Sequence, residues 1–380
     1  MILERKYDIE EIQKRIRYYP VTAIIGPRQS GKTTLAGMLR PDMIFDLENP
    51  VDMAALENPV LQLDKEKGLI IIDEIQLKPE LFPVLRYLCD KNPECRFCIL
   101  GSASPDIIKQ SSESLAGRIS FYVLMGFRKE DLPHSLLEHF HFRGGLPRSL
   151  LAPDDTTSVM WRKDYVKTFL ERDIPLLGIR IPPYTLLRFW QMLAHYHANV
   201  VNFSEIGRSL EISDTQVRRY IEILAGTFMV RLLQPWYANI GKRLVKRPKL
   251  YIRDSGILHS LLMIESKDAL LRHPKLGASW EGFALEAVVR SIKKNDDEIF
   301  FYGVHSGAEL DMVWQHGGYA WGCEFKFSDA PVLTKSMHNA VQDLQLKKAW
   351  IVYPGQKKYK VKNTIEVIPF DDIPDVWVYD

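Results

Sequence analysis

The chain of 380 residues has few cysteines, little net charge and no long apolar run. Its four cysteines, at positions 89, 95, 98 and 323, have neither the spacing of a disulfide framework nor that of a zinc site, which favours buried thiols in a reducing compartment. The net charge of +2 excludes a uniformly basic protein, so any surface that binds nucleic acid must be local. No apolar stretch approaches the roughly 18 residues of a membrane span, and no signal peptide is recognisable. We therefore expect a cytoplasmic protein without a membrane partner.

The sequence is that of a globular protein with several domains. Apolar residues make up 46% and charged residues 26% of the chain, which is ordinary for a protein with ample core. Residues 1–150 alternate strand-like apolar runs with helical segments, a pattern typical of a parallel α/β sheet. Residues 151–200 have helical spacing interrupted by Pro182 and Pro183, which indicates a helical lid or linker.

The most informative motif is Gly26-Pro27-Arg28-Gln29-Ser30-Gly31-Lys32-Thr33, with Thr34 following it. It lies between a strand-like run (21–25) and a helix-like segment (34–40), which is the context of a phosphate-binding loop. Backbone N–H groups would surround the phosphates, and the helix start adds its positive dipole end. Lys32 would reach the β and γ phosphates, and the Thr33 hydroxyl would hold Mg²⁺. The sequence therefore predicts a site for ATP with Mg²⁺.

Two further strand ends indicate hydrolysis. The apolar run 68–72 ends in Asp73, which would hold the Mg²⁺ water shell, and Glu74, which would orient or deprotonate the attacking water. The run 96–100 is followed by Ser102 and Ser104, of which either would sense the γ-phosphate, although serines at strand ends are also common turn residues.

Arg118 is a candidate for completing the site. A guanidinium stabilises charge on the transferring phosphoryl group, and the same chain or a neighbouring subunit can supply it. A surface arginine in a structural ion pair is the alternative that spacing alone leaves open. The catalytic set expected from the sequence is thus Glu74, Lys32, Arg118 and Ser102.

Residues 201–265 indicate a winged-helix module. Ile206 and Leu210 lie four apart in a first short helix, Ser213 is placed to cap a second helix, and a hairpin wing follows. The residues expected to contact DNA are Thr215, Arg218 and Arg219 on the second helix and Lys242, Arg243, Lys246 and Arg247 in the wing. Two alternatives stay open: the module binds protein, or the cations merely solvate a hairpin.

Residues 266–380 contain a possible nuclease centre. Asp311 lies on one strand, and Glu324 and Lys326 lie on the strand that returns after a glycine turn. A hairpin would bring Asp311 beside Glu324, so that two carboxylates hold Mg²⁺ or Mn²⁺, with Lys326 near the attacking water and Glu281 completing the set. Asp followed by Glu-x-Lys resembles the restriction-endonuclease-like fold. A fold that has lost its chemistry, or an unrelated α/β domain, would explain the pattern equally.

These motifs in this order resemble a broad prokaryotic family of AAA-type ATPases. Its members join a phosphate-loop domain to a C-terminal domain of unknown function with a winged helix and a restriction-endonuclease-like fold. The resemblance covers nearly the whole chain and also rests on Gly144-Gly145-Leu146-Pro147, Glu171-Arg172-Asp173, Asp254-Ser255-Gly256 and Trp280-Glu281. One departure is Gly303, where the family often has a basic residue, and this departure argues against cleavage.

The resemblance implies an ATPase. We expect an ATP-driven machine that acts on DNA, branched forms such as Holliday junctions included, in recombination or repair. A subunit-supplied Arg118 would make it a ring-forming homo-oligomer such as a hexamer. Two alternatives stay open: a nucleotide-controlled regulatory or defence switch that binds a protein partner, and an ATP-regulated, metal-dependent nuclease.

Overall fold

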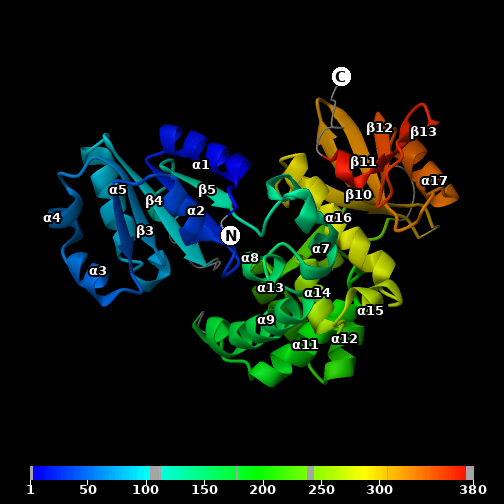
Figure 1. The fold of residues 1–380 in the computed structure, drawn as a ribbon, viewed down its shortest axis with the longest axis horizontal. Helices are drawn as coiled ribbons and strands as arrows, with labels where there is room; N and C mark the ends of the chain where they lie inside the picture. Colours follow the sequence, from blue (N-terminus) through cyan, green and yellow to red (C-terminus); the bar gives the residue numbers. More distant parts are fainter. Residues whose placement is uncertain are drawn as a thin grey trace. The chain divides into compact units, whose positions relative to one another are not determined.

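The computed structural model describes residues 3–102, 111, 113–176, 179–237, 244–305 and 307–373, which form two compact units (Figure 1). The N-terminal unit comprises Met1–Leu136, Gly145–Leu151 and Gly226–Phe228, and the C-terminal unit comprises Leu137–Gly144, Ala152–Ala225 and Met229–Asp380. In the described part of the chain, no helix combines the length and the apolar composition that crossing a bilayer requires.

The N-terminal unit contains a five-stranded parallel sheet with the strand order β2-β3-β4-β1-β5. Its strands are β1 (Val21–Gly26), β2 (Met43–Asp46), β3 (Gly68–Asp73), β4 (Cys95–Ser102) and β5 (Ile119–Val123). Its described helices are α1 (Lys6–Tyr18), α2 (Lys32–Met38), α3 (Pro50–Ala55), α4 (Pro59–Leu63), η1 (Ile75–Leu77), α5 (Leu81–Lys91), η2 (Lys129–Asp131) and α8 (Pro147–Leu150).

A layer of helices covers each face of this sheet. Leu81, Leu85 and Leu88 of α5 recur at helical spacing and pack on one face. Ile12 of α1 and Leu35 of α2 pack on the other. Every residue of β1 is buried, as expected of a central strand covered on both sides. Because the strands are parallel, the carboxyl ends of β1, β3 and β4 meet at one edge, where the phosphate loop begins.

The C-terminal unit contains a nine-stranded mixed sheet with the order β13-β14-β12-β11-β10-β9-β7-β8-β6. Its strands are β6 (Asn199–Val200), β7 (Val230–Pro235), β8 (Lys249–Ile252), β9 (Ile299–Gly303), β10 (Glu309–His316), β11 (Tyr319–Phe325), β12 (Lys348–Tyr353), β13 (Tyr359–Lys362) and β14 (Ile365–Pro369). Its described helices are α7 (His134–Arg143, which begins in the N-terminal unit), α9 (Asp155–Thr168), the π-helix η3 (Phe169–Asp173), α10 (Ile174–Leu176), α11 (Pro183–His195), α12 (Phe203–Leu210), α13 (Asp214–Gly226), α14 (Ser255–Leu261), α15 (Lys267–Leu271), α16 (Leu276–Ser291), α17 (Lys335–Asp343) and η4 (Phe370–Asp372).

Helices α16 and α17 cover opposite faces of this sheet. Ala284 and Val288 of α16 join a core cluster with the β10 residue Trp314. Met337 and Val341 of α17 join a second cluster on the other face. The ladder between β9 and β10 shifts register between Leu310 and Val313, and such a bulge re-aims the side chains within it. Asp311 lies inside this bulge.

The strands that follow the helix–turn–helix, β7 and β8, belong to the same sheet as the C-terminal strands. Ser213 precedes α13, and its hydroxyl accepts a hydrogen bond of 3.2 Å from the Gln216 N–H, so it caps the helix as predicted. Strand β7 pairs in parallel with β9, where Gln234 and Pro235 lie opposite Phe300 and Phe301. The predicted α/β class is confirmed, with a parallel phosphate-loop sheet followed by a sheet-rich region.

A buried ion cluster ties β7 to α16. Arg231, with a side chain 1% exposed, donates to Glu286 through Nε at 2.6 Å and through Nη2 at 3.1 Å. Its Nη1 donates to Asp296 at 2.6 Å, and Arg253 Nε lies 3.4 Å from Glu286. Burial alone would raise the pKa of Glu286, but Arg231 and Arg253 outweigh burial and lower this pKa to about 2.

We predict that Glu286→Gln lowers the free energy of unfolding of the C-terminal unit by about 3–5 kcal/mol, because it leaves the buried Arg231 without its main counter-charge. In the unchanged protein this contribution is complete above the ordinary glutamate pKa of 4.5 and is lost as the pH falls from there through about 2. Urea titrations over a pH series measure it. The control is Glu298→Gln, which removes a surface pair with Lys294 and costs about 0.3–0.5 kcal/mol. An equal decrease in the free energy of unfolding in Glu286→Gln and Glu298→Gln would contradict the prediction.

Candidate nucleotide site and acidic centre

The phosphate loop follows β1 and requires its two glycines. A Cβ on Gly26 would lie 2.1 Å from the carbonyl oxygen of Leu124, so no larger residue fits there. Gly31, at the start of α2, has a φ of +92°, which side chains strongly disfavour. The loop backbone therefore depends on both glycines of the motif.

Lys32 spans the loop. Its ammonium donates hydrogen bonds to the carbonyl oxygens of Gly26 at 3.2 Å and Pro27 at 3.0 Å, and only 7% of the residue is exposed. The N–H groups of the first turn of α2 have no partner within the helix and carry its positive dipole end. Loop, ammonium and helix start together form a binding site for phosphate groups.

Thr33 and Asp73 lie together, as a magnesium site requires. The Thr33 hydroxyl donates a 2.6 Å hydrogen bond to Asp73 Oδ2, and Asp73 Oδ1 accepts one of 2.8 Å from the Glu74 N–H. Hydroxyl and carboxylate oxygens suit Mg²⁺, which proteins bind through one or two such groups together with substrate phosphates. These residues fit the ion, and bound there with ATP it would neutralise charge on the phosphates.

Glu74 follows Asp73 directly at the carboxyl end of β3. It follows β3 with a left-handed φ of +53°, and its carboxylate accepts a hydrogen bond from the side-chain amide of Gln76. Burial raises the pKa of Glu74, while the Gln76 hydrogen bond opposes that rise. Gln76 thus orients the carboxylate, a role that the sequence pattern did not reveal.

The structure describes some of the remaining residues predicted near the phosphates and not others. Ser102 lies opposite Gly26 in the ladder between β4 and β1, but its side chain and the whole of Ser104 lie outside the described residues. The Arg28 guanidinium lies 3.5 Å from the Glu48 carboxylate.

Arg118 lies at the opposite edge of the sheet from the phosphate loop. Its carbonyl oxygen accepts from the Val21 N–H, at the start of β1, whereas Gly26 ends that strand. At about 3.3 Å per residue, β1 separates the two edges by roughly 17 Å. The guanidinium makes two hydrogen bonds to Asp90, of 2.7 and 2.9 Å. Within one chain, Arg118 therefore does not reach the phosphates.

Arg5 is a residue of this site that sequence analysis missed. Its buried guanidinium donates to the carbonyl oxygens of Ser30 at 3.0 Å and of Met125 and Gly126 at 2.9 Å each. Its Nε donates to Asp8 at 2.7 Å. Arg5 thereby joins the back of the phosphate loop to the segment after β5. No local motif marks it, because the carbonyl groups that it contacts lie 25 and about 120 residues away.

We predict that Glu74→Gln retains ATP binding but slows hydrolysis by about 10²–10⁴-fold, because a positioned general base contributes that much. Steady-state phosphate release and equilibrium binding of a fluorescent ATP analogue measure the two effects. Glu80→Gln is the matched control, since Glu80 is an exposed carboxylate in the segment after η1. Unchanged turnover in Glu74→Gln would remove Glu74 from the mechanism.

The predicted DNA-binding residues on α13 are exposed. Thr215, Arg218 and Arg219 all lie at its surface, and the Arg218 guanidinium stacks 3.9 Å from the ring centroid of Phe203 on α12. Lys246 and Arg247 are also exposed. Lys242 and Arg243 lie outside the described residues.

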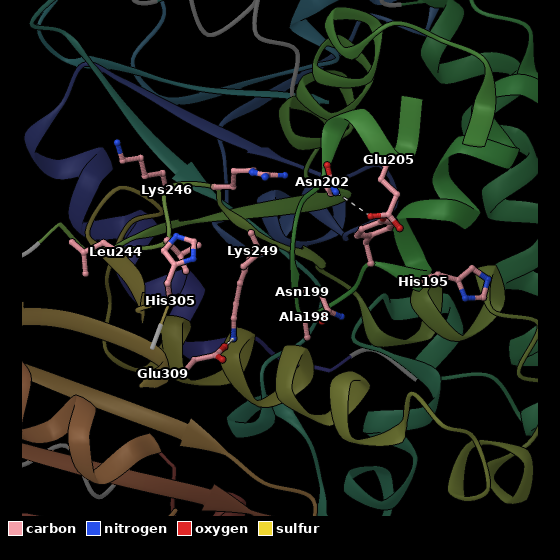
Figure 2. Close-up of a pocket in the computed structure, with 14 residues that line it drawn as sticks. His195, Ala198, Asn199, Asn202, Glu205, Leu244, Lys246, Lys249, His305 and Glu309 are labelled. Carbon is pink, nitrogen blue, oxygen red and sulfur yellow. Dashed lines mark hydrogen bonds and ion pairs between the residues drawn. The ribbon is translucent and has the colours of Figure 1, made fainter. Parts of the chain in front are cut away.

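A pocket of about 1020 Å³ lies beside this module within the C-terminal unit (Figure 2). Asn202 and Glu205 of the helix–turn–helix line it, together with the exposed Lys246 and Arg247. Figure 2 shows Lys249 pointing toward Glu309 at one side of this pocket. The pocket therefore extends from the helix–turn–helix to Lys249 and Glu309, which are neighbours of the predicted nuclease residue Asp311.

The predicted nuclease residues come together around a lysine that the sequence did not single out. Lys249 of β8 lies 3.2 Å from Asp311 and 3.5 Å from Glu281. Glu281 also accepts a 2.7 Å hydrogen bond from the Tyr251 hydroxyl. The adjacent carboxylate Glu324 pairs instead with Lys326, at 2.7 Å. We call Glu281, Glu309, Asp311 and Glu324 the acidic centre.

The acidic centre does not fit a divalent ion as it is arranged. The Lys249 ammonium contacts the carboxylate oxygens that would have to coordinate the metal. Among the residues that the structure describes, no set of three or more His, Cys, Asp or Glu side chains is arranged to hold a metal ion. The expected pairing of Asp311 and Glu324 around Mg²⁺ or Mn²⁺ is thus replaced by two lysine–carboxylate groupings.

Comparison with known proteins matches three family models along the chain. Residues 18–132 match an AAA domain, and residues 134–268 and 276–373 match two domains of unknown function, DUF8612 and DUF4143. A solved Walker-type ATPase of Pyrococcus abyssi is similar with a TM-score of 0.47 and 16% identity, over 69% of this chain and 96% of that one.

Two mycobacterial proteins are similar over nearly the whole chain. They are the uncharacterized proteins Mb2031c of Mycobacterium bovis and Rv2008c of Mycobacterium tuberculosis, each 45% identical over 377 residues, which is 98% of this chain and 85% of theirs. Together with the family models, this similarity extends from the phosphate loop to the acidic centre. The chain belongs to the family of these two proteins, and it is a P-loop ATPase of the AAA type with additional C-terminal domains of unknown function.

Proposed function

We propose that the protein hydrolyses ATP and uses the hydrolysis to act on DNA through its C-terminal unit. Hydrolysis is supported by three features of one sheet edge: the loop spanned by Lys32, the Thr33–Asp73 pair and the Glu74 carboxylate. Positioning and electrostatic stabilisation are what phosphoryl transfer needs, and these groups supply both. Action on DNA is carried by the exposed face of α13.

That face has the chemistry of a recognition helix. Thr215, Arg218 and Arg219 lie in the first half of α13, which is the second helix of the helix–turn–helix. In such a motif, the first residues of the second helix contact base edges in the major groove. Lys246 and Arg247 offer two more exposed cations for phosphate contacts. Branched DNA is included in the proposal, since phosphate contacts of this kind do not depend on an unbroken duplex.

A ring of subunits is the second part of the proposal. Arg118 lies at the sheet edge away from its own phosphate loop, and its side chain is 32% exposed. A guanidinium there would meet a phosphate only in the site of another copy, where it would stabilise the transferring group. The competing explanation is that the Asp90 pair is its whole role.

One observation favours a second candidate function, that of a nucleotide-controlled switch with a protein partner. Asp214 and Glu222 are exposed on the same helix as the two arginines, so the helix carries both signs of charge. Mixed charge suits a protein surface better than a phosphate backbone. A metal-dependent nuclease is not proposed, because Lys249 fills the acidic centre.

We predict that one form of DNA, whether single-stranded, duplex or four-way junction, stimulates steady-state ATP hydrolysis at fixed salt. Arg219→Ala should weaken that DNA's binding and reduce the slope of log K against log salt by about 0.9, since one phosphate contact is lost. Lys360→Ala is the matched control, because Lys360 is an exposed cation on β13, at the other end of the sheet order. If no DNA form changes the rate of ATP hydrolysis and a protein partner is recovered instead, the result would favour the nucleotide-controlled switch.

The ring predicts complementation between inactive chains. Arg118→Ala and Glu74→Gln should each hydrolyse ATP slowly, whereas a mixture should regain activity in sites that combine Glu74 of one chain with Arg118 of another. Phosphate release from pre-mixed chains measures this. A mixture no faster than the average of its components, or a fully active Arg118→Ala, would assign Arg118 to its ion pair alone.

A further inference from the structure

Lys249 stands at the meeting point of three carboxylates from two elements. Its Nζ lies 2.5 Å from Glu309, 3.2 Å from Asp311 and 3.5 Å from Glu281. Glu309 and Asp311 belong to β10, and Glu281 belongs to α16. An ammonium has three N–H donors, so one lysine can serve all three carboxylates.

The surroundings hold Lys249 in its charged form. Its side chain is 4% exposed, and its Nζ lies 5.6 Å from the centroid of the Phe301 ring. Burial alone would lower the pKa of Lys249, but Tyr251 and the three carboxylates keep it well above the ordinary value. Three carboxylates around one ammonium favour its charged form.

The fourth carboxylate, Glu324, completes the outline of an ion site. One of its oxygens pairs with Lys326 at 2.7 Å. The other is buried and accepts no hydrogen bond from the described residues. Burial raises the pKa of Glu324 to about 8, with Asp311 as the next contributor. The two lysines thus divide the acidic centre: Lys249 contacts Glu281, Glu309 and Asp311, and Lys326 contacts Glu324.

We propose that the Lys249 ammonium takes the place of a divalent metal ion in the acidic centre and keeps this centre closed to metal ions. A metal ion needs carboxylate oxygens at about 2.0–2.6 Å. Asp311 Oδ1 and Glu281 Oε1 face the ammonium instead, and Asp311 Oδ2 accepts a 3.0 Å hydrogen bond from the Phe325 N–H. A divalent ion beside a buried ammonium would also meet like charge without solvent to screen it.

Lack of access does not explain the exclusion. Lys249 and Glu309 both line the pocket of about 1020 Å³, which is wide enough for a hydrated ion (Figure 2). An ion can therefore approach the acidic centre, where the Lys249 ammonium already contacts the carboxylates. Since the Lys249 side chain alone excludes the divalent ion, a substitution of Lys249 should remove the exclusion.

The test measures Mn²⁺ binding to the full chain by electron paramagnetic resonance and calorimetry. Lys249→Met should bind one more Mn²⁺ per chain than the unchanged protein, with affinity at this centre stronger by on the order of tenfold or more. Adding Asp311→Asn to Lys249→Met should abolish this extra ion, which assigns it to the acidic centre. Lys246→Met is the matched control, since Lys246 lines the same pocket but is exposed.

Two results would overturn the proposal. One is a folded Lys249→Met protein that gains no ion. The other is an unchanged protein that already binds an ion removed by Asp311→Asn. If Lys249→Met does not fold, Lys249→Gln replaces it. A further test needs neither variant and compares the unchanged protein with Asp311→Asn. Equal Mn²⁺ binding by these two proteins supports the proposal.

Discussion

The short parallel ladder between β7 and β9 is the contact on which the C-terminal unit depends. Gln234 and Pro235 pair with Phe300 and Phe301, and the Trp236 N–H donates to the Phe301 carbonyl at 2.7 Å. This junction makes one sheet from the strands beside the helix–turn–helix and the strands of the acidic centre. Without it, β8 would not run near β10, and Lys249 would have no carboxylates to meet. The two regions are therefore a single folded body.

Burial of charge is the second constraint on this unit. Arg231 and Lys249 are both nearly inaccessible, and each is compensated by carboxylates from a different element. Burying either charge without compensation would cost several kcal/mol per ion. Such pairs therefore select the one arrangement of helix and sheet that matches every charge. Arg231 fixes α16 against β7 in this way.

The local parts of the structure could be predicted from sequence, and the distant pairings could not. The loop from Gly26 to Thr33 and the carboxylates after β3 follow from short motifs, because their chemistry depends on neighbours in the chain. The hairpin that carries Asp311 and Glu324 follows from alternation and a glycine turn. The role of Lys249 does not follow from the sequence, since its burial depends on the β7–β9 junction and on a bulge about 60 residues away. The placement of Arg118 likewise needed the register of β5 beside β1.

The contacts of Arg5 determine when, during synthesis of the chain, the phosphate loop can reach its final structure. Its guanidinium holds the phosphate loop to the carbonyls of Met125 and Gly126, so the finished loop cannot exist before the ribosome has added those residues. At ordinary elongation rates of about 5–20 residues per second, that delay is roughly 6–24 s after Arg5 is synthesised. During this interval the nascent chain contains the glycine-rich motif, but Arg5 does not yet connect the loop to Met125 and Gly126. Stabilisation by bound ATP, which acts only on the folded form, thus begins after the last strand of the N-terminal sheet is complete.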